Sequence, residues 1–216
     1  MKIEGMKINF LGDSITEGVG ASETSKRYTD VMQRKYGIIA NNYGISGTRF
    51  ARQSVVTDDP FDQDYCMRVS TMDETADAVI VFGGTNDYGH GDAPLGTPDD
   101  RTPATFYGAC HYLFNELLNR YSGKPILILT PLHRLNENNP RGDRKPEDVA
   151  PLSTYRKIIM EVAEIYSLKV LDLYKDAGIQ PNNEINRNML APDGLHPSDI
   201  GHELLADRIA TALINY

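Results

Sequence analysis

The sequence alternates short apolar runs with longer segments in which apolar residues recur at helical spacing. This alternation is typical of β-α units, which build a parallel sheet covered by helices. Two of the runs, at 78–82 and 125–130, are rich in Val, Ile and Leu, as expected for central strands buried on both faces. We therefore predict an α/β fold with five strands, at 7–11, 37–43, 78–82, 125–130 and 168–173.

Three longer segments have the apolar spacing of amphipathic helices. The first spans 103–121, and the second carries an apolar stripe from Tyr155 to Tyr166 ahead of the fifth strand. The last helix is expected to begin after Pro197, where Ser198 is a suitable N-cap. Because 216 residues fit one ordinary domain, residues 1–216 are interpreted as a single domain.

The charge balance narrows the range of partners. A formal charge of -8 and a pI near 5.1 leave no basic stripe to neutralise phosphates, so we expect no nucleic-acid partner. No window approaches the roughly 20 apolar residues that span a bilayer, so no membrane insertion is expected either. Residues 1–10 contain no apolar stretch of secretory length, which makes a cytoplasmic protein the default expectation, although a removed signal peptide would leave no trace.

Two cysteines, Cys66 and Cys110, lie in helix-like segments without metal-ligand spacing. They are predicted to be buried thiols rather than a disulfide or a nucleophile. We predict no cofactor and no metal site.

Two polar segments, 87–101 and 132–149, follow the third and fourth predicted strands. Loops this long are uncommon in compact domains and are often functional. In a parallel sheet both would emerge at the carboxyl edge, where ligands bind, so we predict that they form the walls of a substrate cleft. The loop charge Lys145 is expected to be solvated. The candidate cleft residues are Asp13, Tyr88, His133 and Arg134.

Ser14 follows the first predicted strand and Asn86 follows the third, so right-handed crossovers can bring both to one edge of the sheet. A serine hydroxyl is a poor nucleophile unless a base removes its proton. His196 is the best candidate for that base, because Asp193 lies three residues earlier and can hold one ring nitrogen. The chain has four other histidines, which are left as alternatives or as structural residues: His90, His111, His133 and His202.

Acyl transfer also needs donors aimed at the oxyanion that develops on the substrate carbonyl. The backbone N–H of Ser14 is suitable if a helix begins there, and the Asn86 side chain can supply a second donor. A third donor could come from segment 41–48, where glycine lets the backbone approach a ligand closely. From composition alone, these glycines fit ordinary turns equally well.

The chain resembles the SGNH hydrolase superfamily, also called the GDSL esterase/lipase family, over essentially its whole length. Four segments are similar to the family's sequence blocks: Gly-Asp-Ser at 12–14, Asn-Tyr-Gly-Ile-Ser-Gly at 42–47, Gly-Thr-Asn-Asp at 84–87 and Asp-Gly-Leu-His at 193–196. The resemblance implies that Ser14 is the nucleophile and that Asp193 orients His196 as general acid and base. It also implies an oxyanion hole formed by the N–H groups of Ser14 and Gly47 and the amide of Asn86.

The same resemblance implies a flavodoxin-like three-layer α/β/α sandwich, in which five parallel strands have the order 2-1-3-4-5. This agrees with the five strands predicted from periodicity. One departure is minor: Ile15 stands where the family's name-giving motif has leucine.

The implied function is hydrolysis of a carboxylic ester by two-step acyl transfer. The polar residues assigned to the cleft favour a short acyl group, such as acetyl, on a polar alcohol such as a sugar. The expected partner is accordingly a small-molecule or oligosaccharide ester. A lysophospholipase or thioesterase is the main alternative, and a metal-dependent phosphoesterase or a non-catalytic carbohydrate-binding relative are minor ones. The sequence leaves the oligomeric state open.

Overall fold

The sheet is parallel and has five strands in the order β2-β1-β3-β4-β5. The computed structural model describes residues 1–216. Its strands are β1 (Lys7–Gly12), β2 (Ile39–Gly44), β3 (Ala78–Phe82), β4 (Ile126–Leu129) and β5 (Lys169–Leu171). The fold class and the strand order expected from the sequence are both confirmed.

Strands β2, β4 and β5 are shorter than predicted, and for β2 and β5 the reason is that neighbouring helices take up their ends. Helix α2 (Tyr28–Tyr36) is capped by Gly37, whose N–H donates to the Gln33 carbonyl at 3.1 Å, so β2 begins only afterwards. At the other edge, α7 (Leu173–Asp176) begins just after β5. Asp172 lies between β5 and α7. Its side chain forms an ion pair with Arg156, and its backbone does not continue the pairing of β5 with β4.

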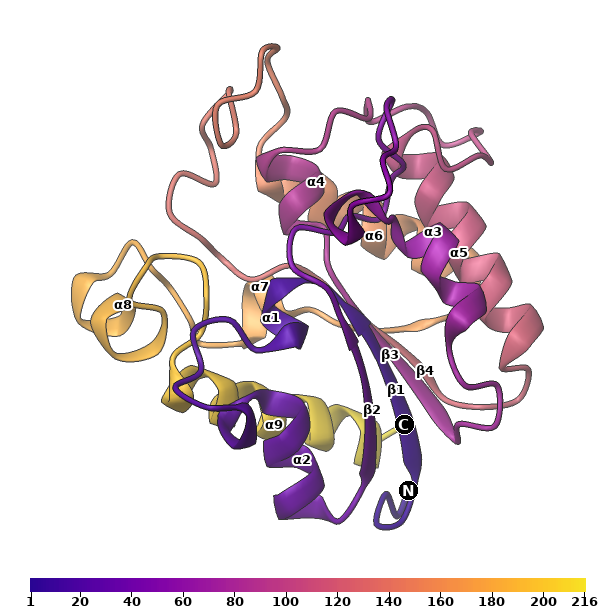
Figure 1. Ribbon diagram of the computed structural model, residues 1–216, viewed down its shortest axis with the longest axis vertical. Coiled ribbons are helices and arrows are strands. Elements are labelled where there is room, and N and C mark those ends of the chain that lie inside the picture. The colour runs from indigo at the N-terminus through magenta and orange to yellow at the C-terminus, as the bar shows by residue number, and fades with distance from the viewer.

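Successive side chains of each strand enter two different hydrophobic cores, one on each face of the sheet. In β3, Val79 and Val81 belong to one core, whereas Ala78 and Ile80 belong to the other. Figure 1 shows the resulting layers, with α2 and α9 on one side of the sheet and α5 and α6 on the other. The bounds of these larger helices are α5 (Phe106–Arg120), α6 (Leu152–Ile165) and α9 (Asp199–Ile214).

Shorter elements connect the layers. Ser198 caps α9 as predicted, since its side chain accepts the N–H of Gly201. No helix of the structure combines the length and the apolarity that crossing a bilayer requires. The remaining elements are α1 (Ser14–Glu17), α3 (Tyr65–Arg68), α4 (Thr85–Gly89), α8 (Glu184–Leu190), η1 (Thr24–Lys26), η2 (Pro60–Asp62) and η3 (Val69–Thr71).

Cys66 of α3 and Cys110 of α5 are both free and buried in the same core, as predicted. Burial raises the pKa of both thiols well above the ordinary value. Both are therefore held in the neutral form, which is a poor nucleophile.

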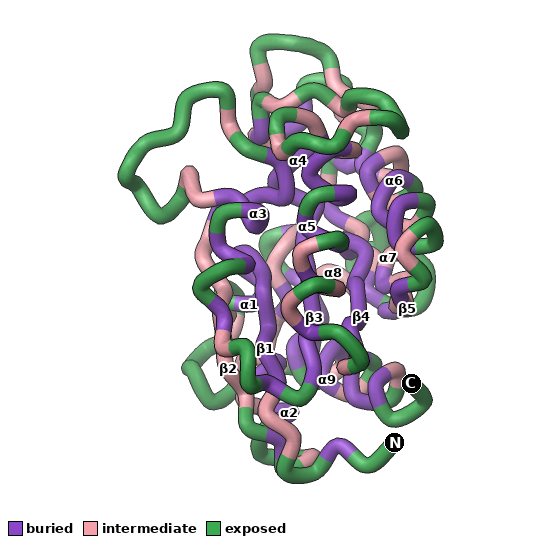
Figure 2. Tube along the Cα trace, turned by 90° about the vertical axis from the view of Figure 1, so that its right-hand side faces the viewer, coloured by how far each residue is buried: buried purple, intermediate pink, exposed green.

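The register of the sheet brings three chain segments to one edge. Gly12 at the end of β1 lies opposite Gly44 of β2 and opposite Phe82 of β3. The segments that follow these three residues therefore leave the sheet side by side. Figure 2 shows that β1, β3 and β4 are buried along their length, whereas exposed residues concentrate in the loops.

His202 of α9 is fully buried, in agreement with a structural role. Its Nδ1 accepts the backbone N–H of Tyr28 at 3.2 Å, and its Nε2 donates to the Val19 carbonyl at 3.4 Å. The ring also stacks on Tyr28, with the ring centroids 6.2 Å apart. His202 thus joins the last helix to α2 and to the segment after α1.

The burial of His202 predicts a loss of stability in acid. Burial lowers the pKa of His202 to about 4, although the nearby Asp199 carboxylate raises it slightly. Because the pKa is lower in the folded state than in the unfolded state, this contribution is complete above about pH 6.5 and is lost as the pH falls towards about 4. We expect wild-type protein to lose roughly 2 kcal/mol more unfolding free energy than His202→Asn between about pH 7 and about pH 4.5. Urea denaturation at the two pH values measures this, and equal losses would contradict the assignment.

Candidate active site

Ser14 is the first residue of α1, two residues after the end of β1. The chain turns sharply there: a Cβ on Gly12 would lie 1.9 Å from the Thr16 hydroxyl oxygen, so only glycine fits. Asp13 caps the helix by accepting the N–H of Ile15 at 3.0 Å. As the first residue of the helix, Ser14 has an N–H without a partner within α1.

The structure brings together the three residues predicted to form the triad. Ser14 Oγ lies 2.9 Å from His196 Nε2, and His196 Nδ1 lies 2.7 Å from the Asp193 carboxylate. With the Nδ1 proton held by the carboxylate, Nε2 is left to accept the proton of the serine hydroxyl. The arrangement is therefore that of a nucleophile, a base and a residue that orients the base.

Asp193 is itself held in place by the turn that it begins. One carboxylate oxygen accepts the N–H groups of Leu195 and His196, at 2.8 and 2.7 Å. Burial raises the pKa of Asp193, but these bonds and the His196 side chain outweigh it and hold the pKa below the ordinary value. Outside the turn, Leu135 N–H donates to the Gly194 carbonyl at 2.8 Å, which ties loop 132–149 to the turn.

Gly47 and Asn86, the residues predicted to be oxyanion donors, each keep an N–H that the protein does not use. Gly47 has a φ of +77°, and a Cβ there would lie 1.9 Å from the ring of Phe61, so glycine is required on both grounds. The Gly47 N–H makes no hydrogen bond within the protein. Asn86 donates one amide proton to the Thr48 carbonyl at 3.0 Å, which leaves its second amide proton for a ligand.

One carbonyl group, that of Gly12, ties these segments together. It accepts the N–H of Ile45 at 3.1 Å and the Arg68 guanidinium at 3.2 Å. The Thr48 hydroxyl lies 3.4 Å from it and donates at 2.7 Å to the Ile45 carbonyl. Arg68 is buried and also donates to the Thr48 hydroxyl at 2.8 Å. Arg68 therefore braces the segment that carries Gly47 against the end of β1.

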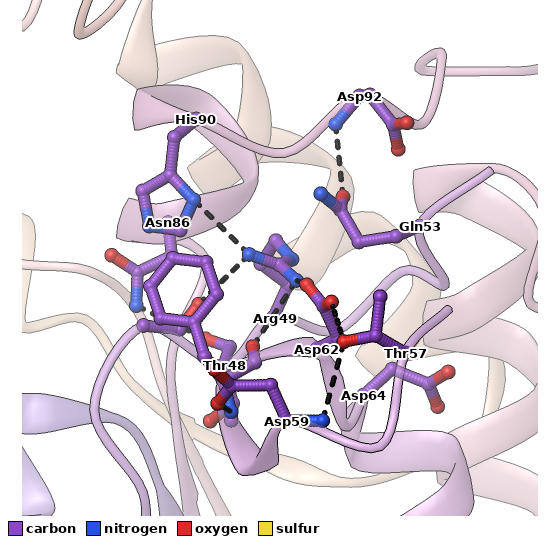
Figure 3. A network of polar contacts seen from close by, with 12 residues as sticks. Thr48, Arg49, Gln53, Thr57, Asp59, Asp62, Asp64, Asn86, His90 and Asp92 are labelled. Carbon is purple, nitrogen blue, oxygen red and sulfur yellow. Dashed lines mark hydrogen bonds and ion pairs between the residues drawn. The ribbon is translucent and has the colours of Figure 1, made fainter. Parts of the chain in front are cut away.

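Arg49 forms a second brace, shown in Figure 3. Its side chain is only 1% exposed. The guanidinium donates to the Gly47 carbonyl and to His90 Nδ1, both at 3.1 Å, and to the Phe61 carbonyl and Asp62 at 3.2 Å. It fixes the peptide group of Gly47 and the segment that covers it. Neither buried arginine was predicted, because nothing in the sequence distinguishes an inward-facing arginine from a solvated one.

The cleft residues predicted from the sequence are mostly turned inward, which corrects that expectation. Asp13 is buried as a helix cap, and burial, with a further contribution from the nearby Asp87 carboxylate, raises its pKa to about 7. The Tyr88 ring is in the core and its hydroxyl donates to the Asn139 carbonyl at 3.1 Å. Both side chains are therefore engaged in internal contacts at the edge of the sheet.

The other two predicted cleft residues also make internal contacts. Arg134 is buried and forms an ion pair with Asp143 at 2.6 Å. His133 is partly exposed, with its Nδ1 2.9 Å from the Glu137 carboxylate. Lys145, expected to be solvated, is half-buried and donates to the Asp87 carbonyl at 2.7 Å, and its burial lowers its pKa to about 8. Polar side chains of loop 132–149 are thus used to hold the loop in place.

Comparison with known proteins settles the family. A family model described as the GDSL-like lipase/acylhydrolase family matches residues 10–204. The chain belongs to this family. The match extends from β1 into α9 and includes all four sequence blocks. No curated protein sequence matches the chain.

Solved structures share the fold of this GDSL-family protein. One crystal structure is 30% identical, with 100% of this chain and 99% of the other covered and a TM-score of 0.85. A protein from Lactobacillus plantarum is 27% identical, with 99% of each chain covered and a TM-score of 0.85. An acetyl xylan esterase is 23% identical, with 96% of this chain and 100% of the other covered and a TM-score of 0.65.

Removal of the Asn86 amide tests its role as an oxyanion donor. We expect Asn86→Ala to lower kcat for p-nitrophenyl acetate by roughly 100- to 1000-fold, the loss caused by removing one preorganised donor. Asn182→Ala, a change at an exposed asparagine, is the matched control and should keep wild-type kcat. A loss of less than about tenfold in Asn86→Ala would show that Asn86 only holds the Thr48 carbonyl.

Proposed function

We propose that the protein is a serine esterase that removes a short acyl group, of which acetyl is the best fit, from a carbohydrate or a similar polar alcohol. The observation that carries the proposal is the continuous hydrogen-bonded chain from Ser14 through His196 to Asp193. Membership of the GDSL-like lipase/acylhydrolase family supports ester hydrolysis as the class of reaction.

The proposed reaction has two steps. His196 Nε2 takes the proton of Ser14 as Oγ attacks the ester carbonyl, and the oxyanion accepts hydrogen bonds from the Ser14 and Gly47 N–H groups and the Asn86 amide. His196 then gives the proton to the leaving alcohol oxygen, and the ester C–O bond breaks. Water repeats the sequence on the acyl-enzyme, with His196 accepting its proton, and releases the acid and free Ser14.

One comparison supports the short acyl group and the sugar. An acetyl xylan esterase that is 23% identical shares the fold of this chain. Structures described as lipases share the same fold, so the length of the acyl group is decided by the activity panel below.

The test is an activity panel on the purified protein. We expect kcat/KM to fall from p-nitrophenyl acetate through the butyrate to the octanoate, and acetate to be released from acetylated xylo-oligosaccharides. A preference for chains longer than butyryl would instead favour a lysophospholipase or a thioesterase. Labelling of Ser14 by a fluorophosphonate distinguishes a working hydrolase from a non-catalytic binding protein, and loss of activity with a chelator would favour a metal-dependent phosphoesterase.

A further inference from the structure

A cavity that contains none of the catalytic groups borders the end of α4, the helix that carries Asn86. It has a volume of about 570 Å³ and lies between residues 90–95 and residues 145–150. We call it the loop cavity. Its walls include His90, Asp92, Leu95, Lys145, Val149 and Tyr155. The two long loops therefore form a binding space, but in a different place from Ser14.

Three polar groups in the loop cavity keep hydrogen-bonding capacity that the protein does not use. Tyr155 is only 2% exposed and lines the cavity, yet its hydroxyl has no hydrogen-bond partner in the protein. His90 Nδ1 accepts from Arg49, so the proton of the neutral ring lies on Nε2, which has no protein partner. Lys145 uses one of its three N–H groups on the Asp87 carbonyl. Because these groups face the cavity and are not used by the protein, a polar ligand can form hydrogen bonds with all three.

The charges of the lining favour a neutral occupant. Asp92, Glu147 and Asp148 contribute three carboxylates, of which Asp148 pairs with Arg141 at 3.5 Å, and Lys145 contributes one ammonium. Burial lowers the pKa of His90 to about 4, so its ring adds no positive charge at neutral pH. The lining therefore offers a phosphate or an acidic sugar no excess of positive charge. A neutral polyol can instead use the free donors and the carboxylate acceptors, with its C–H faces against apolar wall residues.

The floor of the loop cavity is attached to the proposed oxyanion hole through α4. His90 and Gly91 donate their N–H groups to the Asn86 carbonyl, at 3.0 and 2.8 Å. Arg49 links the His90 ring to the Gly47 carbonyl, as Figure 3 shows for His90 and Arg49. His90 and Gly91, which line the cavity, are therefore bonded to the residue that carries the Asn86 amide.

We propose that the loop cavity is a saccharide subsite that holds one sugar unit of a neutral oligosaccharide, while an ester-bearing unit of the same molecule occupies the site at Ser14. This inference rests on the proposed function, because it assigns the alcohol part of the substrate. The contacts that carry it are those of the Tyr155 hydroxyl, His90 Nε2–H and Lys145.

Binding is tested without catalysis, in the Ser14→Ala variant of the full chain. Xylotriose and cellotriose, two neutral trisaccharides without ester groups, are titrated into the ¹⁵N-labelled variant and followed by NMR. We expect amide shifts to concentrate in residues 90–95 and 145–150. Adding Tyr155→Phe should weaken binding about five- to tenfold, the loss of one hydrogen bond, and adding Lys145→Gln should weaken it similarly. The matched control is Tyr166→Phe, whose hydroxyl contacts His111 instead of the loop cavity.

Failure of this inference is distinguishable from failure of the proposed function. If neither trisaccharide shifts these amides, or if Tyr155→Phe and Lys145→Gln both bind as tightly as Tyr166→Phe, the saccharide subsite is wrong, whatever the protein hydrolyses. In the active protein, the kcat/KM for acetylated xylotriose relative to that for p-nitrophenyl acetate should fall about five- to tenfold in Tyr155→Phe. Tyr166→Phe should keep the wild-type ratio. Wild-type protein that cleaves p-nitrophenyl acetate but no acetylated oligosaccharide would contradict the proposed substrate, and the titration would still decide on the cavity.

Discussion

Replacing Ser14 with alanine is expected to lower kcat for p-nitrophenyl acetate by about 10⁴- to 10⁶-fold, as loss of the nucleophile does in other Ser-His-Asp hydrolases. The variant has no hydroxyl for His196 to deprotonate, so no acyl-enzyme can form. Residual turnover would come from direct attack of water on the ester, with the remaining N–H donors stabilising the oxyanion. Stopped-flow or long-time assays of p-nitrophenol release measure the change.

Two measurements separate chemistry from folding in this variant. Ser14→Ala should keep the wild-type circular dichroism spectrum and unfold in the same urea range, and it should no longer be labelled by a fluorophosphonate. Ser70→Ala, at an exposed serine, is the matched control and should behave as wild type throughout. Activity of Ser14→Ala within about tenfold of wild type would remove Ser14 from the role of nucleophile.

Replacing Asp193 with asparagine is expected to lower kcat by about 10³- to 10⁴-fold. The neutral amide cannot stabilise the imidazolium that forms at His196, and it can favour the wrong ring tautomer. We expect a loss of kcat near the lower end of this range, because the Asp193 side chain is 55% exposed and water can replace part of its effect. KM should change much less than kcat, because the carboxylate contacts the base and not the ester.

The matched control for this change is Asp176→Asn, at an exposed aspartate on α7. The pKa of Asp193 is held below its ordinary value, so its charge is present in the wild type from mildly acidic pH upward. Asp193→Asn should therefore reduce kcat by a similar factor across neutral pH. A reduction that disappears at neutral pH would mean that Asp193 does not orient His196.

The layered fold could be predicted because the patterns that indicate its strands and helices are local in the sequence. β3 and β4 were predicted because a strand covered by helices on both faces must be apolar at successive positions. The N-cap at Ser198 was predicted because capping needs a specific side chain at a specific place. The errors lie where two elements compete for the same residues, as at Gly37, which caps α2 instead of beginning β2.

The candidate site could be predicted for a different reason. Its polar residues lie in short segments that follow strands or precede a helix, namely Ser14, Asn86, Asp193 and His196. The resemblance to known hydrolases was needed to single out Gly47 among several glycines, since its spacing fits an ordinary turn. The contacts of Arg49 and Arg68 beneath the site could not be predicted, because the sequence does not distinguish a buried arginine from a solvated one.

The loops show the same limit. Their position beside the carboxyl edge followed from the order of the strands. The direction of each side chain did not, because it depends on contacts between residues far apart, such as Arg134 with Asp143 and Lys145 with the Asp87 carbonyl. Tyr155, whose hydroxyl faces the loop cavity, was predicted only as one apolar position of an amphipathic helix.

The hydrogen bonds to the Gly12 carbonyl have a consequence for how the protein unfolds on heating. Because one acceptor at the end of β1 receives donors from Ile45 and from Arg68, the segment that carries Gly47 cannot separate from β1 without breaking a bond to this carbonyl. Many binding sites are placed on parts that open independently of the whole. Here the loss of activity on heating should coincide with global unfolding, so that the esterase rate measures the fraction of folded protein.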